Sequence, residues 1–399
     1  MQLGAVVFAA GLPVAAASLY LLGLALASFR RAAPTPPRPP GLGRLAVLVP
    51  AHDEEELVGR CVASLRDQTY PRSRVIVIAD NCGDRTAEVA RDAGAEVMER
   101  RDLERRGKGY ALRWAMDRLL AAPEPPDAVV VVDADSVADR DLLSHLAAAL
   151  ARGADVAQAE YLVLADATST RSQLVAAAFL LFHRVRLGGR AVLGLPAFLV
   201  GNGMLFSRRL LETLPWNAFT GVEDLEYTVT LRLAGFRPQY VAAALVEGPV
   251  PHGYRGMRGQ RLRWEGGRWH VVRGRLPRLL GHALRRDPGV LDAAVDLAVP
   301  PLGLLTMIAL AGSAVAAVAV ALGIAAAWSQ SPWLLAMAAL TGFVVLGLLS
   351  AGAPRSLWLA LLESPRFLAW KALTYVRIAA GFDPRRWERA DRSGQVRAR

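Results

Sequence analysis

The stretch LAVLVPAHDEE at residues 45–55 places a run of apolar residues directly ahead of a polar and acidic cluster. The same change from apolar to acidic recurs in VIVIADN at residues 75–81 and in VVVVDAD at residues 129–135. Continuous apolar runs of this length are typical of strands that are buried on both faces of a sheet. Helical periods lie between the runs, and this alternation predicts a parallel sheet with right-handed crossovers.

These runs are the first, second and fourth strands that we predict in a wound α/β domain. The carboxyl ends of parallel strands lie at one edge of a sheet, and ligands of such sheets bind outside that edge. Because acidic residues follow all three strands, we expect them to converge there and form the site. The predicted strands are 45–50, 75–79, 96–98 and 129–133, and the predicted helices are 54–68, 84–93, 108–120 and 139–151.

The sequence lacks the signatures of several common kinds of site. No glycine-rich loop follows the first strand, which excludes a phosphate loop and a dinucleotide-binding fingerprint. The sequence also has no Cys/His metal set and no Gly-x-Ser-x-Gly nucleophile elbow. The two cysteines, Cys61 and Cys82, make no disulfide framework, and Cys61 lies in an apolar helical pattern that is typical of a core.

The composition indicates a membrane surface as one partner of the chain. Of its 399 residues 53% are hydrophobic, and its formal net charge is +11. Such a basic balance suits either nucleic acid or the anionic face of a membrane. The basic residues gather beside long apolar segments, which disfavours nucleic acid and favours membrane lipids.

Two apolar regions predict three membrane spans. Residues 3–29 carry no charged side chain, and this run is too long for the apolar part of a signal peptide, so we expect an uncleaved anchor. Arg30 and Arg31 follow it, which predicts an N-terminus outside the cell and a cytoplasmic continuation. Residues 297–354 are free of Asp, Glu, Lys and Arg, and a polar break at 328–333 divides them into a hairpin.

The expected organisation is a multi-pass protein of the inner or plasma membrane with a cytoplasmic α/β domain. Residues 355–382 mix aromatic and basic side chains, as helices in the membrane interface do, although a fourth span stays open there. Asp292 and Asp296 are expected near the interface. The predicted segments are an anchor at 1–30, a Pro-rich linker at 31–43, the α/β domain at 44–280, the hairpin at 281–354, interfacial helices at 355–382 and a basic tail at 383–399.

Three groups of residues in this pattern carry chemistry. Asp133 and Asp135 end the fourth strand, where hard oxygen ligands that leave room for substrate phosphates suit Mg²⁺ or Mn²⁺. Lys108 stands between two glycines at the start of a predicted helix, and a cation there suits a diphosphate. Glu223 and Asp224 open a later helix, either as a cap or, for Asp224, as a general base.

The order of these motifs resembles the membrane-embedded family 2 glycosyltransferases, which include cellulose, chitin and hyaluronan synthases and ceramide glucosyltransferase. The resemblance covers about residues 45–269. It implies a GT-A fold and inverting transfer from a nucleotide-diphosphate sugar, with a UDP-sugar as the expected donor. The motifs are VPAHDE at 49–54, DN at 80–81, DAD at 133–135, ED at 223–224 and QRLRW at 260–264.

The resemblance also implies roles for single residues. Asp80 is expected to hold the nucleoside, Asp135 with Asp133 to bind the metal on the diphosphate, and Asp224 to deprotonate the acceptor. The motif at 260–264 is expected near the diphosphate and the acceptor. The remaining residues expected in the donor and acceptor sites are Pro50, His52, Glu54, Lys108, Gly201, Asn202, Gly203, Glu223, Gln260, Arg263 and Trp264.

Some of these residues also have a plainer interpretation. The segment 201–203 either shapes the sugar pocket or is an ordinary turn. His52, His183 and His252 each offer a third metal ligand, but His183 lies in an apolar helical stretch that is typical of packing. Cys82 stands where many members of the resembled family carry Ser or Thr, and we expect no catalytic role for it.

The number of spans favours a lipid acceptor held at the cytoplasmic face, because synthases that extrude polymers surround the glycan with many helices. A processive polysaccharide synthase subunit, assembled as a homo-oligomer or with a secretion partner, stays open. The alternatives of other classes are an inactive nucleotide-sugar-binding scaffold and a transporter component. Intact acidic motifs disfavour the scaffold, and spans without charges or repeats disfavour the transporter.

Overall fold

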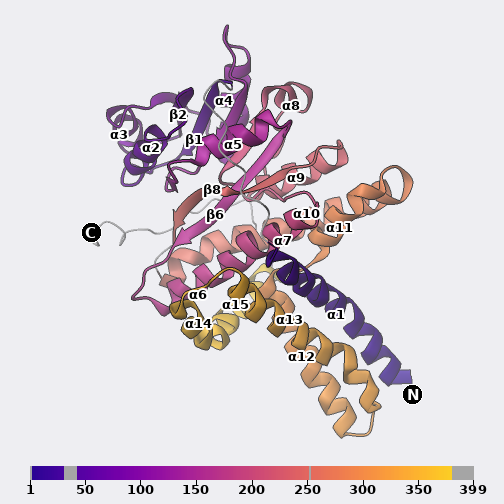
Figure 1. Cartoon of the computed structure of the whole chain (residues 1–399). Helices are drawn as coiled ribbons and strands as arrows, with labels where there is room; N and C mark the ends of the chain where they lie inside the picture. The colour runs from indigo at the N-terminus through magenta and orange to yellow at the C-terminus, as the bar shows by residue number, and fades with distance from the viewer. Residues whose placement is uncertain (1, 31–42, 251–252, 380–399) are drawn as a thin grey trace. The chain divides into compact units, whose positions relative to one another are not determined.

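The computed structural model describes residues 2–30, 43–250 and 253–379, with the side chains of 253–263 and 377–379 outside that description (Figure 1). Contacts within the chain divide it into two units. Of the described residues, the first unit takes 2–30, 167–195 and 294–379, and the second takes the rest. The α/β domain predicted at 44–280 is therefore not continuous, because residues 167–195 group with the apolar helices.

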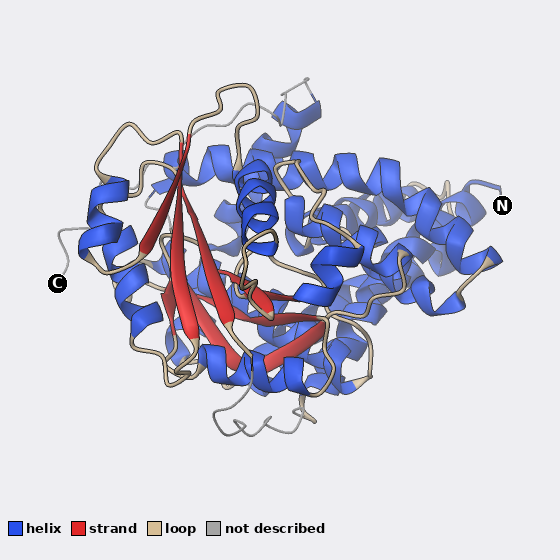
Figure 2. Ribbon diagram, turned by 90° about the horizontal axis from the view of Figure 1, so that it is seen from above, coloured by secondary structure: helices blue, strands red, loops and turns tan. Residues whose placement is uncertain are grey.

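The second unit is built on an eight-stranded sheet with the order β3-β2-β1-β4-β7-β6-β8-β5. Figure 2 shows its strands fanning out across the sheet. The four predicted strands are present and mutually parallel. The strands are β1 (Leu45–Ala51), β2 (Ser73–Asp80), β3 (Glu96–Arg100), β4 (Ala128–Val131), β5 (Val137–Ala138), β6 (Val156–Leu164), β7 (Met204–Ser207) and β8 (Gln239–Pro249).

The parallel arrangement predicted from the first four strands does not continue beyond β4. Strand β7 runs antiparallel to both β4 and β6, whereas β8 runs parallel to β6 and antiparallel to β5. The cause is a turn at the carboxyl edge of the sheet. Gly203, just ahead of β7, donates its N–H to the carbonyl of Val131, the last residue of β4. Strand β7 therefore begins where β4 ends and runs back beside it.

Both faces of the sheet are covered by helices, which explains the continuous apolar runs. In β1, Val47 and Val49 face a core with α2 and α5, whereas Ala46 and Leu48 face a core with α4, α8 and α9. Cys61 is fully buried in the first core, as predicted. The helices of this unit are α2 (Val58–Arg66), α3 (Thr86–Asp92), α4 (Lys108–Leu120), α5 (Leu142–Ala151), α8 (Arg208–Thr213), α9 (Glu223–Leu233), α10 (Gly253–Arg285) and the short η2 (Pro288–Val290).

The first unit is helical and contains three helices that are long and apolar enough to cross a membrane, namely Gln2–Ser28, Leu302–Ala321 and Ala327–Ser350. They correspond to the predicted anchor and hairpin, and they pack side by side (Figure 1). Its helices are α1 (Gln2–Ser28), α6 (Thr170–Phe179), the π-helix η1 (Leu180–Leu187), α7 (Gly188–Val192), α12 (Leu302–Ala321), η3 (Ala327–Gln330), α13 (Ser331–Ser350), α14 (Arg355–Ala360), η4 (Leu361–Glu363) and α15 (Ser364–Ala379).

A buried carboxylate ties segments of the first unit together. Asp296, on α11 (Leu291–Ala298), is 4% exposed and accepts hydrogen bonds from Tyr20 Oη (2.7 Å) and Arg186 Nε (3.0 Å). Arg190 Nη1 lies 3.2 Å from the same carboxylate. A buried charge is tolerated when it is paired and hydrogen-bonded in this way. His183, also in this unit, is buried and stacked on Phe179 with 5.0 Å between ring centroids, which confirms a packing role.

Candidate active site

The acidic segments converge at the carboxyl edge of the sheet, as predicted. Strand β1 leads into the loop of His52, and β2 ends at Asp80. The Nδ1–H of His52 donates to the carbonyl of Asp80 (2.6 Å), so the two loops are joined. Asp133 follows β4, and its carbonyl accepts from the thiol of Cys61 beneath it (3.4 Å).

Lys108 lies at the centre of the charged residues at this edge. Its Nζ donates to Asp133 Oδ1 and to the carbonyl of Gly201, both at 2.5 Å, and lies 3.7 Å from Glu223 Oε1. The lysine begins α4, whereas its three partners come from the loop after β4, the turn before β7 and the start of α9. Burial lowers the pKa of Lys108, but the carboxylates of Asp133 and Glu223 outweigh burial, and the net shift is upward. The ammonium is therefore charged at neutral pH and offsets part of the negative charge of the acidic cluster.

We expect Lys108→Met to lower the free energy of unfolding by about 1–3 kcal/mol at pH 7 in chelator, because Asp133 and Glu223 lose their counter-charge. Thermal unfolding in detergent measures the effect, with Arg85→Met, which removes an exposed pair with Glu88, as the control. The difference in unfolding free energy between the variant and the parent should become smaller below pH 4, where carboxylates take up protons. If the variant has the same melting temperature as the parent at pH 7, the ion pairs of Lys108 contribute nothing to stability.

Asp224 stands beside this cluster in the first turn of α9. Gly201 lies between Asp224 and Lys108: a Cβ at this position would be 3.2 Å from Asp224 Oδ2 and 3.7 Å from Lys108 Nζ. The absence of a side chain therefore leaves room between these two groups. The backbone φ of +83° at Gly201 also favours glycine. Burial and the adjacent Glu223 raise the pKa of Asp224 to about 7, although the Leu225 N–H and Lys108 lower it. The residue at the N-cap position is Val222, so Asp224 is not the cap. Its pKa is matched to proton uptake near neutral pH.

The side chain of Asn202, which was expected in the substrate site, bonds to the acidic loop. Its side chain is fully buried. Its Oδ1 accepts from the N–H of Asp133 (3.1 Å), and its Nδ2 donates to Ser136 Oγ (2.8 Å). Ser136 Oγ in turn donates to Asp135 Oδ1 (3.2 Å). The amide therefore fixes both aspartates of the loop from below.

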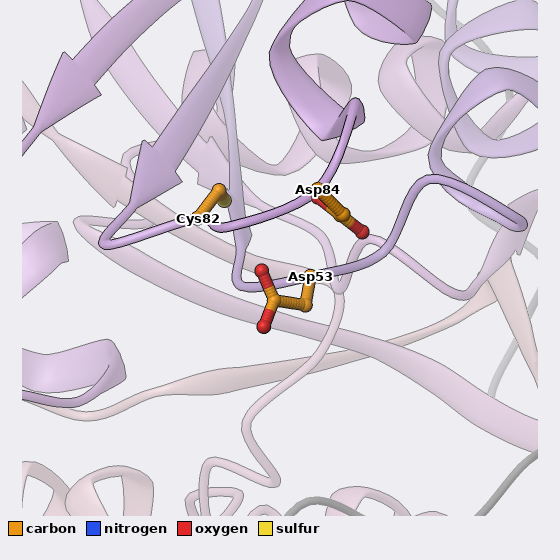
Figure 3. Close-up of side chains that lie close together, drawn as sticks. All are labelled: Asp53, Cys82 and Asp84. Carbon is orange, nitrogen blue, oxygen red and sulfur yellow. The ribbon is translucent and has the colours of Figure 1, made fainter.

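Asp133 and Asp135 are half-buried, and the lysine on Asp133 shows that this carboxylate attracts a cation. Among the described residues, three potential metal ligands come within 4.8 Å of one another at a different place, Asp53, Cys82 and Asp84 (Figure 3). Hydrogen bonds between loops explain that group. Asp53 Oδ1 accepts from the Gly83 N–H (2.7 Å), and Asp84 Oδ2 accepts from the Glu55 N–H (3.2 Å). We therefore keep the metal prediction at Asp133 and Asp135.

The motif at 260–264 lies on α10, next to the helix that carries Asp224. The side chains of Gln260 and Arg263, like the whole of His252, fall outside the described residues, whereas Trp264 is half-buried. A Cβ at Gly267 would meet Val222 at 3.0 Å, so α10 approaches the start of α9 closely. Arg275 Nη2 donates to Glu226 Oε1 (3.0 Å) one turn along α9.

The remaining predicted residues lie at the carboxyl ends of β1 and β2 or in the loop after β1. Pro50 and Glu54 are half-buried, and the Glu54 N–H donates to Thr86 Oγ1 (2.7 Å). Asp80 is buried and paired with Arg100, a residue that the sequence analysis missed. One arginine in an arginine-rich chain gives no sequence signal, and only the pairing of β2 with β3 brings it to Asp80.

Comparisons with known proteins agree with this arrangement. Residues 40–267 match the family model described as glycosyltransferase like family 2. The chain is 24% identical over 242 residues to the probable glycosyltransferase YdaM of Bacillus subtilis (strain 168), which spans 58% of this chain and 56% of that protein. It is 27% identical over 216 residues to the dolichyl-phosphate hexose transferase of Haloferax volcanii, spanning 52% and 82%. The chain thus spans just over half the length of the Bacillus relative.

A solved structure shows the same fold. The mannosyltransferase of Pyrobaculum calidifontis, in complex with GDP-Man and Mn²⁺, superposes with a TM-score of 0.53 over 95% of this chain and 97% of its own, at 19% identity. This likeness confirms the GT-A fold. Because the family model covers more than half of the chain, the protein belongs to glycosyltransferase like family 2.

Proposed function

We propose that the protein is an inverting glycosyltransferase that moves a sugar from a nucleotide-diphosphate donor, with UDP as the expected nucleotide, to a lipid acceptor in the membrane. One observation carries the proposal. In a family 2 domain, Lys108 forms ion pairs with Asp133 and Glu223 at the carboxyl edge of the sheet, and Asp224 lies beside them. A cation for a diphosphate and a base for a hydroxyl are the groups that this reaction needs.

The residues divide the chemistry between them. Asp80 would hold the nucleoside, and Lys108 would leave Asp133 to pair with the diphosphate, offsetting the charge that develops as the glycosidic bond breaks. Asp224 would take the proton of the acceptor hydroxyl as that oxygen attacks the anomeric carbon from the opposite face. Asp135 and Asp133 would hold Mg²⁺ or Mn²⁺, and a divalent ion supplies electrostatic stabilisation of the leaving diphosphate.

Two relatives support the metal and the lipid acceptor. The Pyrobaculum mannosyltransferase was solved with GDP-Man and Mn²⁺, and the Haloferax relative is named a dolichyl-phosphate hexose transferase. The three helices that are long and apolar enough to cross a membrane would, if they do so, keep the chain at a lipid surface. The donor nucleotide, UDP or GDP, is settled by testing both.

The acceptor class follows from the size and solubility of the product. We expect purified full-length protein in lipid nanodiscs, supplied with radiolabelled UDP- or GDP-sugars and a membrane lipid extract, to place single sugars in the organic phase. Heat-inactivated protein is the control. Label in an insoluble polymer instead would contradict the lipid acceptor and favour the synthase subunit, either as an oligomer or with a secretion partner.

We also expect the catalytic domain to be cytoplasmic, because arginines flank the apolar helices on the side where the domain follows. A phosphatase reporter fused after Arg399 should be inactive, and a cytoplasmic fluorescent reporter at the same position should be bright. The opposite pair of results would overturn the topology.

A further inference from the structure

We propose that Arg100 is a positioning residue for the nucleoside end of the donor, holding the carboxylate of Asp80 in a single orientation. The inference rests on the proposed function, in which Asp80 binds the nucleoside. Asp80 and Arg100 are opposite each other in the register of β2 and β3, at the carboxyl edge of the sheet. Arg100 is 5% exposed, and its guanidinium bonds to acceptors of the protein itself.

The guanidinium contacts three acceptors. Its Nη1 donates to Asp80 Oδ1 at 2.6 Å, and its Nη2 donates to Asp102 Oδ2 at 2.9 Å and to the Arg105 carbonyl at 2.8 Å. The planar fork of an arginine serves several acceptors at fixed angles, which the single ammonium of a lysine does not reproduce. Arg100 therefore holds Asp80 against the loop that runs from Asp102 to Lys108.

Asn81 braces the same carboxylate from a second side. Its Nδ2 donates to Asp80 Oδ1 at 3.0 Å and to the Asp102 carbonyl at 3.1 Å, and its Oδ1 accepts from the Asp102 N–H at 2.8 Å. Its backbone takes a φ of +54°, a strained value for a residue with a side chain. Both contacts to the carboxylate fall on Oδ1, so we assign Oδ2 of Asp80 to the nucleoside.

A second arginine pair on the same two strands shows what a purely surface pair looks like. Arg74 Nε and Nη2 bond Glu96 at 2.8 and 2.6 Å, but both side chains are 53% exposed and the pair lies toward the opposite end of the strands. An exposed pair contributes little to stability. A buried pair costs desolvation and is weak evidence for stability by itself. The location of Arg100 beside the donor site, and not its charge, therefore suggests its role.

The test measures affinity for two parts of the donor separately. Full-length protein in detergent is titrated calorimetrically, in the presence of Mn²⁺, with UDP, with GDP and with inorganic diphosphate. For Arg100→Lys we expect a dissociation constant at least tenfold higher for the nucleoside diphosphate that binds the parent, because one ammonium cannot serve all three acceptors and Asp80 loses its fixed orientation. Affinity for inorganic diphosphate should stay within twofold, and donor KM should rise while kcat stays within twofold. The matched control Arg74→Lys should change none of these values.

Other results overturn the inference. Equal weakening of both ligands, or a fall in kcat at unchanged donor KM, would show that Arg100 supports the fold or the chemistry and not the nucleoside. If Arg100→Lys does not fold, Asp102→Asn keeps the Asp80 pair but loosens the guanidinium. We expect it to raise the nucleoside-diphosphate constant about threefold with inorganic diphosphate unaffected, and an unchanged constant would refute the inference. A folded parent that binds neither nucleotide would refute the proposed function itself.

Discussion

Asp224→Asn should slow sugar transfer by roughly 10²–10⁴-fold, the usual effect of removing a general base, while donor affinity stays within a few-fold of the parent. Asparagine keeps the shape of the side chain and its acceptor for the Leu225 N–H, but it accepts no proton. Lys108, and the divalent ion that Asp133 and Asp135 would hold, remain to bind the diphosphate. Initial rates and donor titrations on both proteins measure the two effects separately.

The pH dependence of the parent should report the same group. With its pKa raised to about 7, Asp224 is protonated below that value, so the transfer rate should rise with pH through about 7. The effect on stability has the opposite sign. A carboxyl whose pKa is higher in the folded than in the unfolded chain stabilises the fold at low pH, and this contribution is lost between about pH 4 and 7. In metal-free protein, the Asp224→Asn variant should therefore not lose this part of its stability as the pH rises from about 4 to 7.

Glu88→Gln is the control. Glu88 also lies in the first turn of a helix, α3, but its side chain is 63% exposed. It should leave rate, affinity and pH profile unchanged. If Asp224→Asn transfers sugar at the parent rate, or loses rate only through weaker donor binding, Asp224 is a ligand and not the base.

Asp135→Asn, or removal of divalent ions, should lower turnover by about 10³-fold or more, because two carboxylates and a diphosphate would then face one another without the ion that neutralises them. Unlike the base variant, Asp135→Asn should weaken donor binding in Mn²⁺ and leave the weak binding in chelator unchanged. Turnover after dialysis against chelator, and after adding back Mn²⁺ or Mg²⁺, measures the effect.

Cys82→Ala tests the competing group of Asp53, Cys82 and Asp84. If those side chains only brace loops, this variant should keep its metal dependence and most of its rate. Full turnover of the parent in excess chelator would contradict the metal assignment, and loss of metal dependence in Cys82→Ala would move the site to the competing group.

Local patterns in the sequence were enough to predict the first half of the sheet. The strands β1, β2 and β4 are buried on both faces of the sheet. Such strands appear in the sequence as continuous apolar runs, which are easy to recognise. Helix α4 begins and ends at the predicted residues, Lys108 and Leu120, because glycine precedes it and its apolar period is regular. The three long apolar helices were predicted from the length of the apolar segments and their lack of charged side chains.

What the sequence did not predict depends on contacts between distant segments. The direction of β7 is set by a turn that bonds to the end of β4, and two-residue strands such as β5 are too short for any period to show. Residues 167–195 carry a helical pattern, but which unit they pack with is decided by tertiary contacts. For Asn202 the motif was found from the sequence, but only the structure shows that its amide is buried and bonds to the N–H of Asp133.

The central claim is that the cluster around Lys108 transfers sugar from a nucleotide-diphosphate donor. The most direct measurement is nucleoside-diphosphate release by purified full-length protein from a panel of UDP- and GDP-sugars, with Mn²⁺ and a membrane lipid extract. The account predicts release from at least one donor that stops in chelator and falls at least 10²-fold in Asp224→Asn. A folded parent protein that releases nothing from any donor, or an Asp224→Asn variant that releases nucleoside diphosphate as fast as the parent, would contradict it.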